Sequence, residues 1–157
     1  QVFDEHLLLV YTHVSRVSSD LASRQVSKVA RNINQLIEMR EMTFIAKKVL
    51  FDNFNLYEFG RMLRHGWDLK KSLDEKVTTD EVDTIYDIGI DNGAYGGKLL
   101  GAGGGGFVLF FAPPDSHKRI ISKMTNKRCL SVSTSAPGAE VVFSQIPDPS
   151  SKAIEIR

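Results

Sequence analysis

The sequence predicts an α+β domain with an antiparallel sheet and with helices packed on one side of that sheet. Three observations lead to this prediction. A short apolar run, Leu7–Tyr11, opens the chain, a long helical middle follows, and strand-like segments return only in the glycine-rich stretch Gly96–Phe111 and beyond it. Strands that are separated by helices in the chain and then paired in space are typical of the α+β class.

The composition describes an ordinary globular protein. The chain has 157 residues, a length that fits one domain spanning residues 1–157. Net charge is +1, which gives no electrostatic reason to expect nucleic acid or an anionic membrane as a partner. The single cysteine, Cys129, excludes an internal disulfide and a cysteine-cluster metal site. With no membrane-spanning apolar run, we expect a cytoplasmic protein.

The first half of the chain predicts one strand and then helices. Leu7–Tyr11 is a continuous apolar run of the kind that forms a buried strand. Ser18 or Ser19 can cap the next helix, because a hydroxyl there accepts a backbone N–H of the first turn. Apolar residues then keep helical spacing to about Asp52, with a break allowed near residues 31–34.

Two further helices carry their own start signals. Asn55 and Glu58 form a capping-box pattern for a helix that ends near Leu73, and Thr78 and Glu81 repeat this pattern for the next helix. The second helix has the inward face Val82, Ile85, Tyr86 and Gly89 and the C-terminal stop Asn92-Gly93.

The last third predicts one helix between strands. A Pro-Pro pair ends the strand after the glycines, and Asp115 or Ser116 begins a short helix. Its inward residues are Ile120, Ile121 and Met124. Cys129–Thr134 alternates as a half-exposed strand does, and residues 139–143 alternate again. Residues 144–157 form either a loose tail or an edge strand.

The glycine-rich stretch is the candidate functional element. Nine of the 12 glycines lie between Gly89 and Gly106. The flanks are apolar, so this segment is a tight loop between two strands rather than a flexible linker. Glycine permits positive φ, and consecutive exposed N–H groups form an anion-binding concavity. The residues alone leave two interpretations open, a phosphate-contacting loop and a structural bend.

Three known glycine motifs match residues of this stretch, but the neighbouring elements or the missing companion residues exclude each of them. Gly101, Gly103 and Gly106 match G-x-G-x-x-G, but a dinucleotide site needs a helix after the loop and here a strand follows. The longer protein-kinase pattern also matches, yet its companion motifs V-A-I-K, H-R-D and D-F-G are missing. Gly97-Lys98 resembles the end of a P-loop, but Leu99 stands where Ser or Thr would hold magnesium.

A fourth pattern fits. The run GGKLLGAGGGGFVLFF, residues 96–111, closely resembles the third conserved motif of the GHMP kinases, a superfamily that includes galactokinase, homoserine kinase and mevalonate kinase. Val10-Tyr11-Thr12 with Ser15-Arg16 is similar to the segment that opens the C-terminal domain of its sugar-kinase members. Here His13 replaces the glycine that is usual after the threonine.

Upstream residues narrow the resemblance. Trp67 with Lys70, and Ile85-Tyr86 before Gly93-Ala94, look like the heptose 7-phosphate kinase branch, with fucokinase close by. The resemblance extends from about Leu7 to Met124. It implies a ferredoxin-like C-terminal domain and transfer of the ATP γ-phosphoryl group to a sugar hydroxyl with Mg²⁺. In the heptose branch the acceptor would be the anomeric hydroxyl of D-glycero-D-manno-heptose 7-phosphate; fucose or another small sugar is the alternative.

The same resemblance implies that the enzyme is not complete in this chain. The family's main ATP loop, P-x-x-x-G-L-x-S-S, and its catalytic aspartate belong to the N-terminal half, and neither pattern occurs here. We therefore expect no catalytic residue in this chain and no kinase activity from it alone. The missing half is the expected partner, and the apolar surface that it would cover favours homodimers. A non-catalytic ligand- or partner-binding module is the alternative function.

Site residues follow from the match. The expected ATP-phosphate contacts are Lys98, Gly101, Ala102, Gly103, Gly104, Gly105 and Gly106. The expected substrate contacts are Thr12, Ser15 and Arg16, in the loop after the first strand. Trp67 is expected to pack in the core rather than to stack on a sugar. The four histidines show no metal-ligand spacing, so no metal ligand is expected.

Overall fold

The computed structural model of the chain describes residues 2–14, 18–52 and 54–135. Its sheet consists of β1 (Leu7–Tyr11), β2 (Gly96–Leu99), β3 (Phe107–Phe111) and β4 (Cys129–Ser131). The strands lie in the order β2-β3-β1-β4, and each neighbouring pair is antiparallel. Because β3 separates β1 from β2 and β1 separates β3 from β4, both helical crossovers are split, which is the ferredoxin-like arrangement. The predicted fold class is confirmed.

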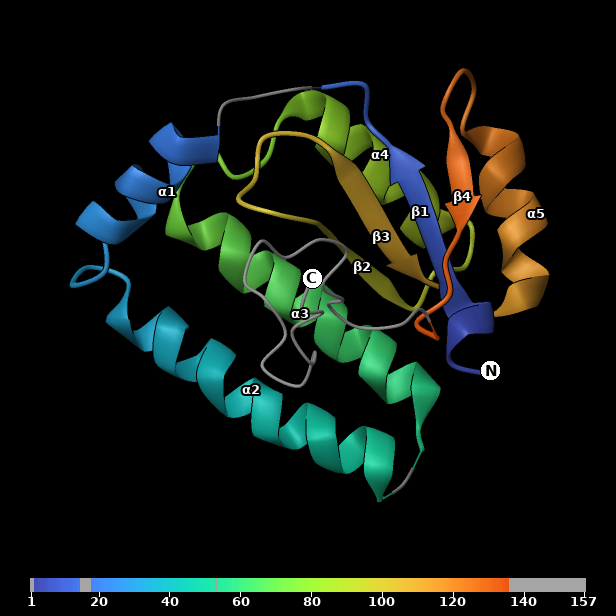
Figure 1. Ribbon diagram of the computed structural model, residues 1–157, viewed down its shortest axis with the longest axis horizontal. Coiled ribbons are helices and arrows are strands. Elements are labelled where there is room, and N and C mark those ends of the chain that lie inside the picture. Colours follow the sequence, from blue (N-terminus) through green and yellow to red (C-terminus); the bar gives the residue numbers. More distant parts are fainter. Residues whose placement is uncertain (1, 15–17, 53, 136–157) are drawn as a thin grey trace, which may run out of the picture.

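In the described part of the chain, five helices accompany the sheet (Figure 1). They are α1 (Ser18–Ser27), α2 (Ile33–Phe51), α3 (Leu56–Leu73), α4 (Asp80–Asp91) and α5 (Pro114–Lys123), and a short 3-10 turn, Asp4–His6, precedes β1. Helix α4 contacts β2, β3 and α5, so α4 and α5 form the layer behind the sheet in Figure 1. Helix α3 follows the edge strand β2, and α2 packs against α3. The break between α1 and α2 falls at residues 28–32, close to its predicted place.

The core lies between the sheet and α4. Alternate residues of the two central strands face it, with Leu8 opposite Phe110 and Val10 opposite Val108. The predicted inward face of α4 is buried, and a Cβ on Gly89 would overlap the Phe110 ring. Trp67 of α3 is 1% exposed and belongs to the same cluster, so it packs in the core as predicted.

A glycine pair sets how closely α3 approaches β2. A Cβ on Gly96 would overlap the backbone carbonyl of Gly60, and a Cβ on Gly60 would overlap Tyr95. Neither residue requires a special φ angle; the close approach of two backbones excludes a side chain there. This contact places the C-terminal part of α3 beside the segment that follows β2.

One predicted helix start is confirmed and one is wrong by a residue. The Asn55 side chain accepts the Glu58 N–H at 3.0 Å, as the capping box requires. Helix α4 is capped by Thr79, whose hydroxyl accepts the N–H three residues on at 3.3 Å. Thr78, the predicted cap, instead donates its hydroxyl to Asp83 at 2.9 Å. Adjacent threonines offer the same chemistry, and only the chain direction selects between them.

The start and face of α5 also differ from the prediction. The helix begins at Pro114 rather than at Asp115 or Ser116, because proline fits the first helical turn, where its missing N–H has no intrahelical partner. Ile121 is 45% exposed and does not face the core. Its neighbours Ile120 and Met124 are buried as predicted.

The last described strand is shorter than the alternation suggests. Strand β4 ends at Ser131 instead of Thr134. The Thr134 N–H and hydroxyl both donate to the Asp4 carboxylate, at 3.1 and 2.6 Å, so a side chain replaces the strand ladder as acceptor there. The strand predicted over residues 139–143 and the tail or edge strand predicted over 144–157 lie outside the described residues.

The first two helices carry apolar residues that they do not bury. The predicted helical spacing forms helices, but large apolar side chains on α1, on α2 and in the turn between them remain at least 42% exposed. These are Val26, Val29, Ile33, Ile37, Phe44, Ile45 and Phe51, which we call the α1–α2 apolar surface. Among the helices described, none combines the length and the apolar character needed to cross a membrane.

Candidate phosphate-binding loop

The connection between β2 and β3 reaches past the end of the sheet toward α1 (Figure 1). Four of its residues have positive φ, namely Gly101 (79°), Gly103 (127°), Gly104 (78°) and Gly106 (105°). Side chains rarely adopt such angles, so the backbone path itself requires glycine at these positions. The predicted strand-loop-strand arrangement is confirmed.

The second half of the loop is fastened by its own amides. The Gly104 N–H donates to the Val77 carbonyl at 2.8 Å, and the Gly106 N–H donates to the Val14 carbonyl at 3.0 Å. A Cβ on Gly105 would overlap that same Val14 carbonyl. These contacts join the loop to the segment after β1 and to the segment before α4, so this half is held rigidly by backbone groups.

Thr12 completes that anchor. It is 1% exposed, and its N–H and hydroxyl both donate to the Gly106 carbonyl, at 2.9 and 3.0 Å. Its oxygen also accepts the Val14 N–H at 3.2 Å. In this structure Thr12 therefore positions the loop, and its contact with substrate stays a prediction. Ser15 and Arg16, the other two expected substrate contacts, lie outside the described residues.

The first half of the loop is held differently, through its carbonyl groups. The Lys70 ammonium group donates to the Gly101 carbonyl at 2.5 Å. The Gln25 amide donates to the Ala102 carbonyl at 3.1 Å. At Gly103 a Cβ would lie 2.8 Å from the Val77 carbonyl oxygen, so this position also has no room for a side chain.

The outcome is a row of available donors. Among the described residues, the N–H groups of Gly101, Ala102, Gly103 and Gly105 have no hydrogen-bond acceptor. Three of them are consecutive, and positive φ at Gly101 and Gly103 gives the backbone the curvature of an anion-binding concavity. A phosphate oxygen is the acceptor that such a row of amides suits.

An ion-pair cluster keeps α1 beside the loop. The Asp74 carboxylate is completely buried and accepts hydrogen bonds from Lys28 at 2.6 Å and from Arg24 at 3.2 Å. The Lys28 contact, and then the Lys76 backbone N–H at 2.9 Å, hold the pKa of Asp74 well below its usual range. Because Arg24 lies in α1 and Lys28 directly follows that helix, the cluster also fixes Gln25 on α1.

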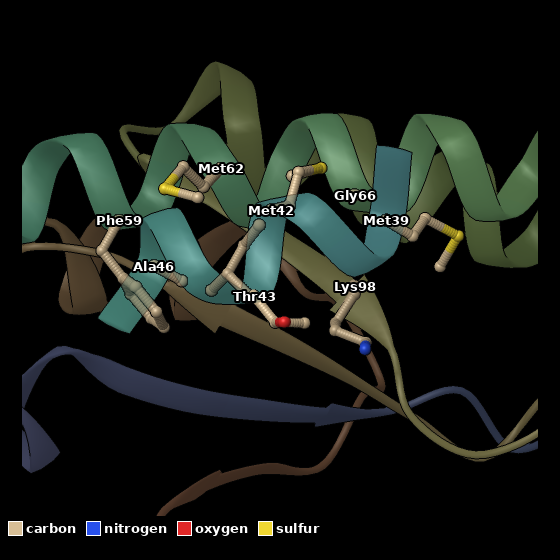
Figure 2. A pocket seen from close by; sticks show the side chains of 9 residues that line it. Met39, Met42, Thr43, Ala46, Phe59, Met62, Gly66 and Lys98 are labelled. Atoms are coloured by element: carbon tan, nitrogen blue, oxygen red, sulfur yellow. The ribbon is translucent and has the colours of Figure 1, made fainter. Parts of the chain in front are cut away.

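Two lysines stand at the entry to the loop. Lys98 of β2 is the one charged residue lining a methionine-rich pocket of about 200 Å³ between α2, α3 and the sheet (Figure 2). Lys70 lies on the last turns of α3. Burial lowers the pKa of Lys70, and the positive charge of Lys98 lowers it further.

Comparison with known proteins now decides the family. The family described as GHMP kinases C terminal matches residues 48–129, just over half of the chain. The chain belongs to the GHMP kinases. Its match includes α3, α4 and the glycine loop, which are the elements that build the site.

Several relatives carry known names. D-glycero-alpha-D-manno-heptose 7-phosphate kinase of Campylobacter jejuni is 29% identical over 123 residues, which are 77% of this chain and 36% of that enzyme. L-fucokinase/L-fucose-1-P guanylyltransferase of Bacteroides fragilis is 31% identical over 75% of this chain and 13% of its own length. The mevalonate kinase structure from Methanococcus jannaschii has a TM-score of 0.68 at 26% identity, covering 83% of this chain and 41% of that one. The chain thus spans about a third of the heptose kinase relative.

Lys98 is the third residue of β2, and Gly101–Gly106 belong to the connection that follows that strand; their contact with ATP phosphate stays a prediction. The loop contacts of Lys70 and Gln25 were not predicted. Lys70 lies one helical turn after the buried Trp67, and this spacing could have indicated which side of α3 Lys70 occupies. No sequence feature indicated that Gln25 would contact the loop.

His13 occupies the position where GHMP sugar kinases usually have glycine. Its φ is 60°, in the left-handed region, which explains why glycine suits that position. As for metals, no group of three or more His, Cys, Asp or Glu side chains in the described part of the chain is arranged to bind a cation.

Proposed function

We propose that this chain is the C-terminal part of an ATP-dependent kinase that phosphorylates a hydroxyl of a sugar or sugar phosphate. The row of unbonded amides at Gly101, Ala102 and Gly103 is the observation that carries the proposal. Phosphoryl transfer depends mainly on positioning and on stabilising charge on the phosphoryl oxygens. Amides that are already oriented supply both without reorganising during the reaction.

The residues divide into two roles. The free amides of the loop and the Lys98 ammonium group would contact the phosphates of ATP. Thr12, Val77 and Val14 hold the loop in the shape that exposes those amides. Ser15 and Arg16 remain the proposed contacts of the acceptor sugar, because a guanidinium group can bond two hydroxyls or a phosphate at once.

For the acceptor we propose the anomeric hydroxyl of D-glycero-D-manno-heptose 7-phosphate. The named heptose kinase relative supports this choice, since its similarity extends over 77% of the chain. Fucose is the second candidate acceptor, because the fucokinase relative is similar over nearly the same share.

The remainder of the enzyme would supply what this chain lacks. The proposed N-terminal half carries the P-x-x-x-G-L-x-S-S loop and the aspartate that takes the acceptor proton. The α1–α2 apolar surface is compatible with an additional chain segment packing there. We expect the 157-residue chain by itself to show no phosphoryl transfer.

Product analysis tests the acceptor directly. The native gene product that carries this chain is incubated with MgATP and, separately, with heptose 7-phosphate, fucose and mevalonate, and products are followed by ³¹P NMR. We expect a new anomeric phosphate with heptose 7-phosphate only. Formation of fucose 1-phosphate instead would replace the proposed acceptor, and no product with any acceptor, despite ATP binding, would favour a non-catalytic module.

The isolated chain is the matched control for the division of the enzyme. It is assayed under the same conditions after circular dichroism has shown that it is folded. Turnover by the isolated chain at the rate of the native gene product would contradict the proposed division.

A further inference from the structure

Two lysines from different elements lie near the segment that leads into the glycine loop. Lys70 extends from α3 and Lys98 from β2, and Lys70 reaches the carbonyl of Gly101, the first glycine of the loop. The β2–α3 contact at Gly96 and Gly60 brings these two elements together. Lys70 therefore lies at the start of the row of free amides, and the positive charge of Lys98 is close enough to lower the pKa of Lys70.

Neither cation is neutralised by the protein. Within residues 2–14, 18–52 and 54–135, no carboxylate lies within 4.0 Å of the Lys70 or Lys98 amine. The neighbouring Lys71 differs, because it pairs with Asp68 at 3.4 Å. Two like charges near one another cost free energy unless an anion offsets them, and Lys70 is in addition partly desolvated.

We propose that Lys70 and Lys98 together form a phosphate-binding site at the entry of the glycine loop, with Lys70 contacting the bound phosphate directly. A phosphate placed between the two ammonium groups would accept a charged hydrogen bond from each of them. This phosphate site would be part of the proposed kinase, and the identity of the molecule that carries the phosphate rests on that proposed function. That source is either ATP or the phosphate of the acceptor.

The main competing account is that Lys70 only holds the loop. If Lys70 only holds the loop, its ammonium group serves solely to bond the Gly101 carbonyl. A bound phosphate would then leave the environment of the Lys70 amine unchanged. A phosphate ligand of Lys70 would instead raise the pKa of the amine and cover it. The reactivity of the amine therefore separates the two roles without an activity assay.

Competitive acetylation of the native gene product tests the site. Trace acetic anhydride labels only uncharged amines, and mass spectrometry gives the rates at Lys70, Lys98 and the exposed Lys47, which is the control. Labelling is measured without ligand and with MgATP, D-glycero-D-manno-heptose 7-phosphate or inorganic phosphate. We expect a bound phosphate to slow labelling of Lys70 and Lys98 about tenfold, as a pKa rise of about one unit would, and to leave Lys47 unchanged.

The ligands distinguish the two sources. Protection by MgATP alone assigns the site to a nucleotide phosphate, and protection by the sugar phosphate alone assigns it to the acceptor. Unchanged Lys70 labelling at ligand concentrations that saturate binding in calorimetry would overturn the proposal. Protection of Lys70 in a protein that forms no phosphorylated product would retain the phosphate site and refute only the kinase function.

Substitutions give a second, independent measurement. Lys70→Met should weaken binding of the protecting ligand by about tenfold or more, consistent with loss of one charged hydrogen bond. Lys70→Arg should recover part of that loss because the charge remains. Lys47→Met, which removes the same charge from α2, should bind normally. Equal binding by Lys70→Met and the unsubstituted protein would contradict a direct contact.

Discussion

The two halves of the glycine loop are built in opposite ways. From Gly104 to Gly106, the amides at both ends donate to backbone carbonyls of Val77 and Val14. From Gly101 to Gly103, the carbonyls of Gly101 and Ala102 accept bonds from side chains, and all three amides are left without acceptors in the described chain. One half thus serves as the anchor, and the other presents donors to a ligand.

The difference lies in which groups do the holding. Backbone carbonyls are supplied by almost any sequence, so the anchor depends on glycine, on chain path and on one side chain, the Thr12 hydroxyl. The donor-presenting half depends on two particular side chains, Lys70 and Gln25, and on the helices that carry them. Substitutions should therefore affect stability in the first case and ligand binding in the second.

The largest expected effect comes from the cluster that places α1. Replacing Asp74 with Ala removes the acceptor of two cations and a backbone amide, and should lower the free energy of unfolding by about 3 kcal/mol. The pKa of Asp74 is lower in the folded protein than in the unfolded chain, so this stabilisation is complete above about pH 4 and declines below it. Urea unfolding at pH 7 and at pH 3 should show the gap between the two proteins narrowing in acid.

Glu75 provides the control for that comparison. Its carboxylate also contacts Arg24, at 3.3 Å, but its side chain is 80% exposed. Replacing Glu75 with Ala should change stability by about 0.5 kcal/mol or less, because exposed ion pairs are screened by solvent. A loss as large as that of the Asp74 variant would show that burial is not what makes the cluster strong.

The next effect separates the loop halves directly. Gly105→Ala places a Cβ against the Val14 carbonyl, and should cost about 1–3 kcal/mol of stability through overpacking. Gly101→Ala places its Cβ in open space at a φ of 79°, so the strain should be about 1–2 kcal/mol. We expect only the Gly101 variant to lose more affinity for ATP than its stability loss explains. Calorimetric binding beside urea unfolding measures both, and equal behaviour of the variants would remove the distinction.

A smaller effect is expected at Gln25. Gln25→Ala deletes the hydrogen bond to the Ala102 carbonyl and should cost about 0.5–1.5 kcal/mol. The ¹⁵N order parameters should then fall at Gly101–Gly103 but stay unchanged at Gly104 and Gly106. A fall of the same size over the whole loop would mean that the halves are not independent.

The smallest expected effect is a gain. His13 is exposed and has a φ of 60°, a conformation that costs a side-chain-bearing residue free energy. His13→Gly should therefore raise the midpoint of thermal unfolding slightly, offset in part by the greater freedom of glycine in the unfolded chain. A lower midpoint would show that the His13 ring, 4.7 Å from the Tyr11 ring, contributes more than the strain costs.

Much of the architecture was predictable because its signals are local. The apolar run of β1, the Asn55 cap and the inward face of α4 each follow from a few neighbouring residues, and the structure confirms them. Errors arose where a distant group intervened. Asp4, far away in the chain, takes the Thr134 N–H and hydroxyl and ends β4 early.

By itself, the sequence determined the fold class, the family and the loop that matters, because glycine content and apolar flanks constrain the backbone wherever the segment lies. Only the tertiary structure decided which amides of the loop are free. That depends on Val14, Val77, Gln25 and Lys70, which come from four separate segments. Hydrogen bonds between segments distant in the chain leave no periodic pattern in the sequence, so the division of the loop into an anchor and a donor row could be seen only after folding.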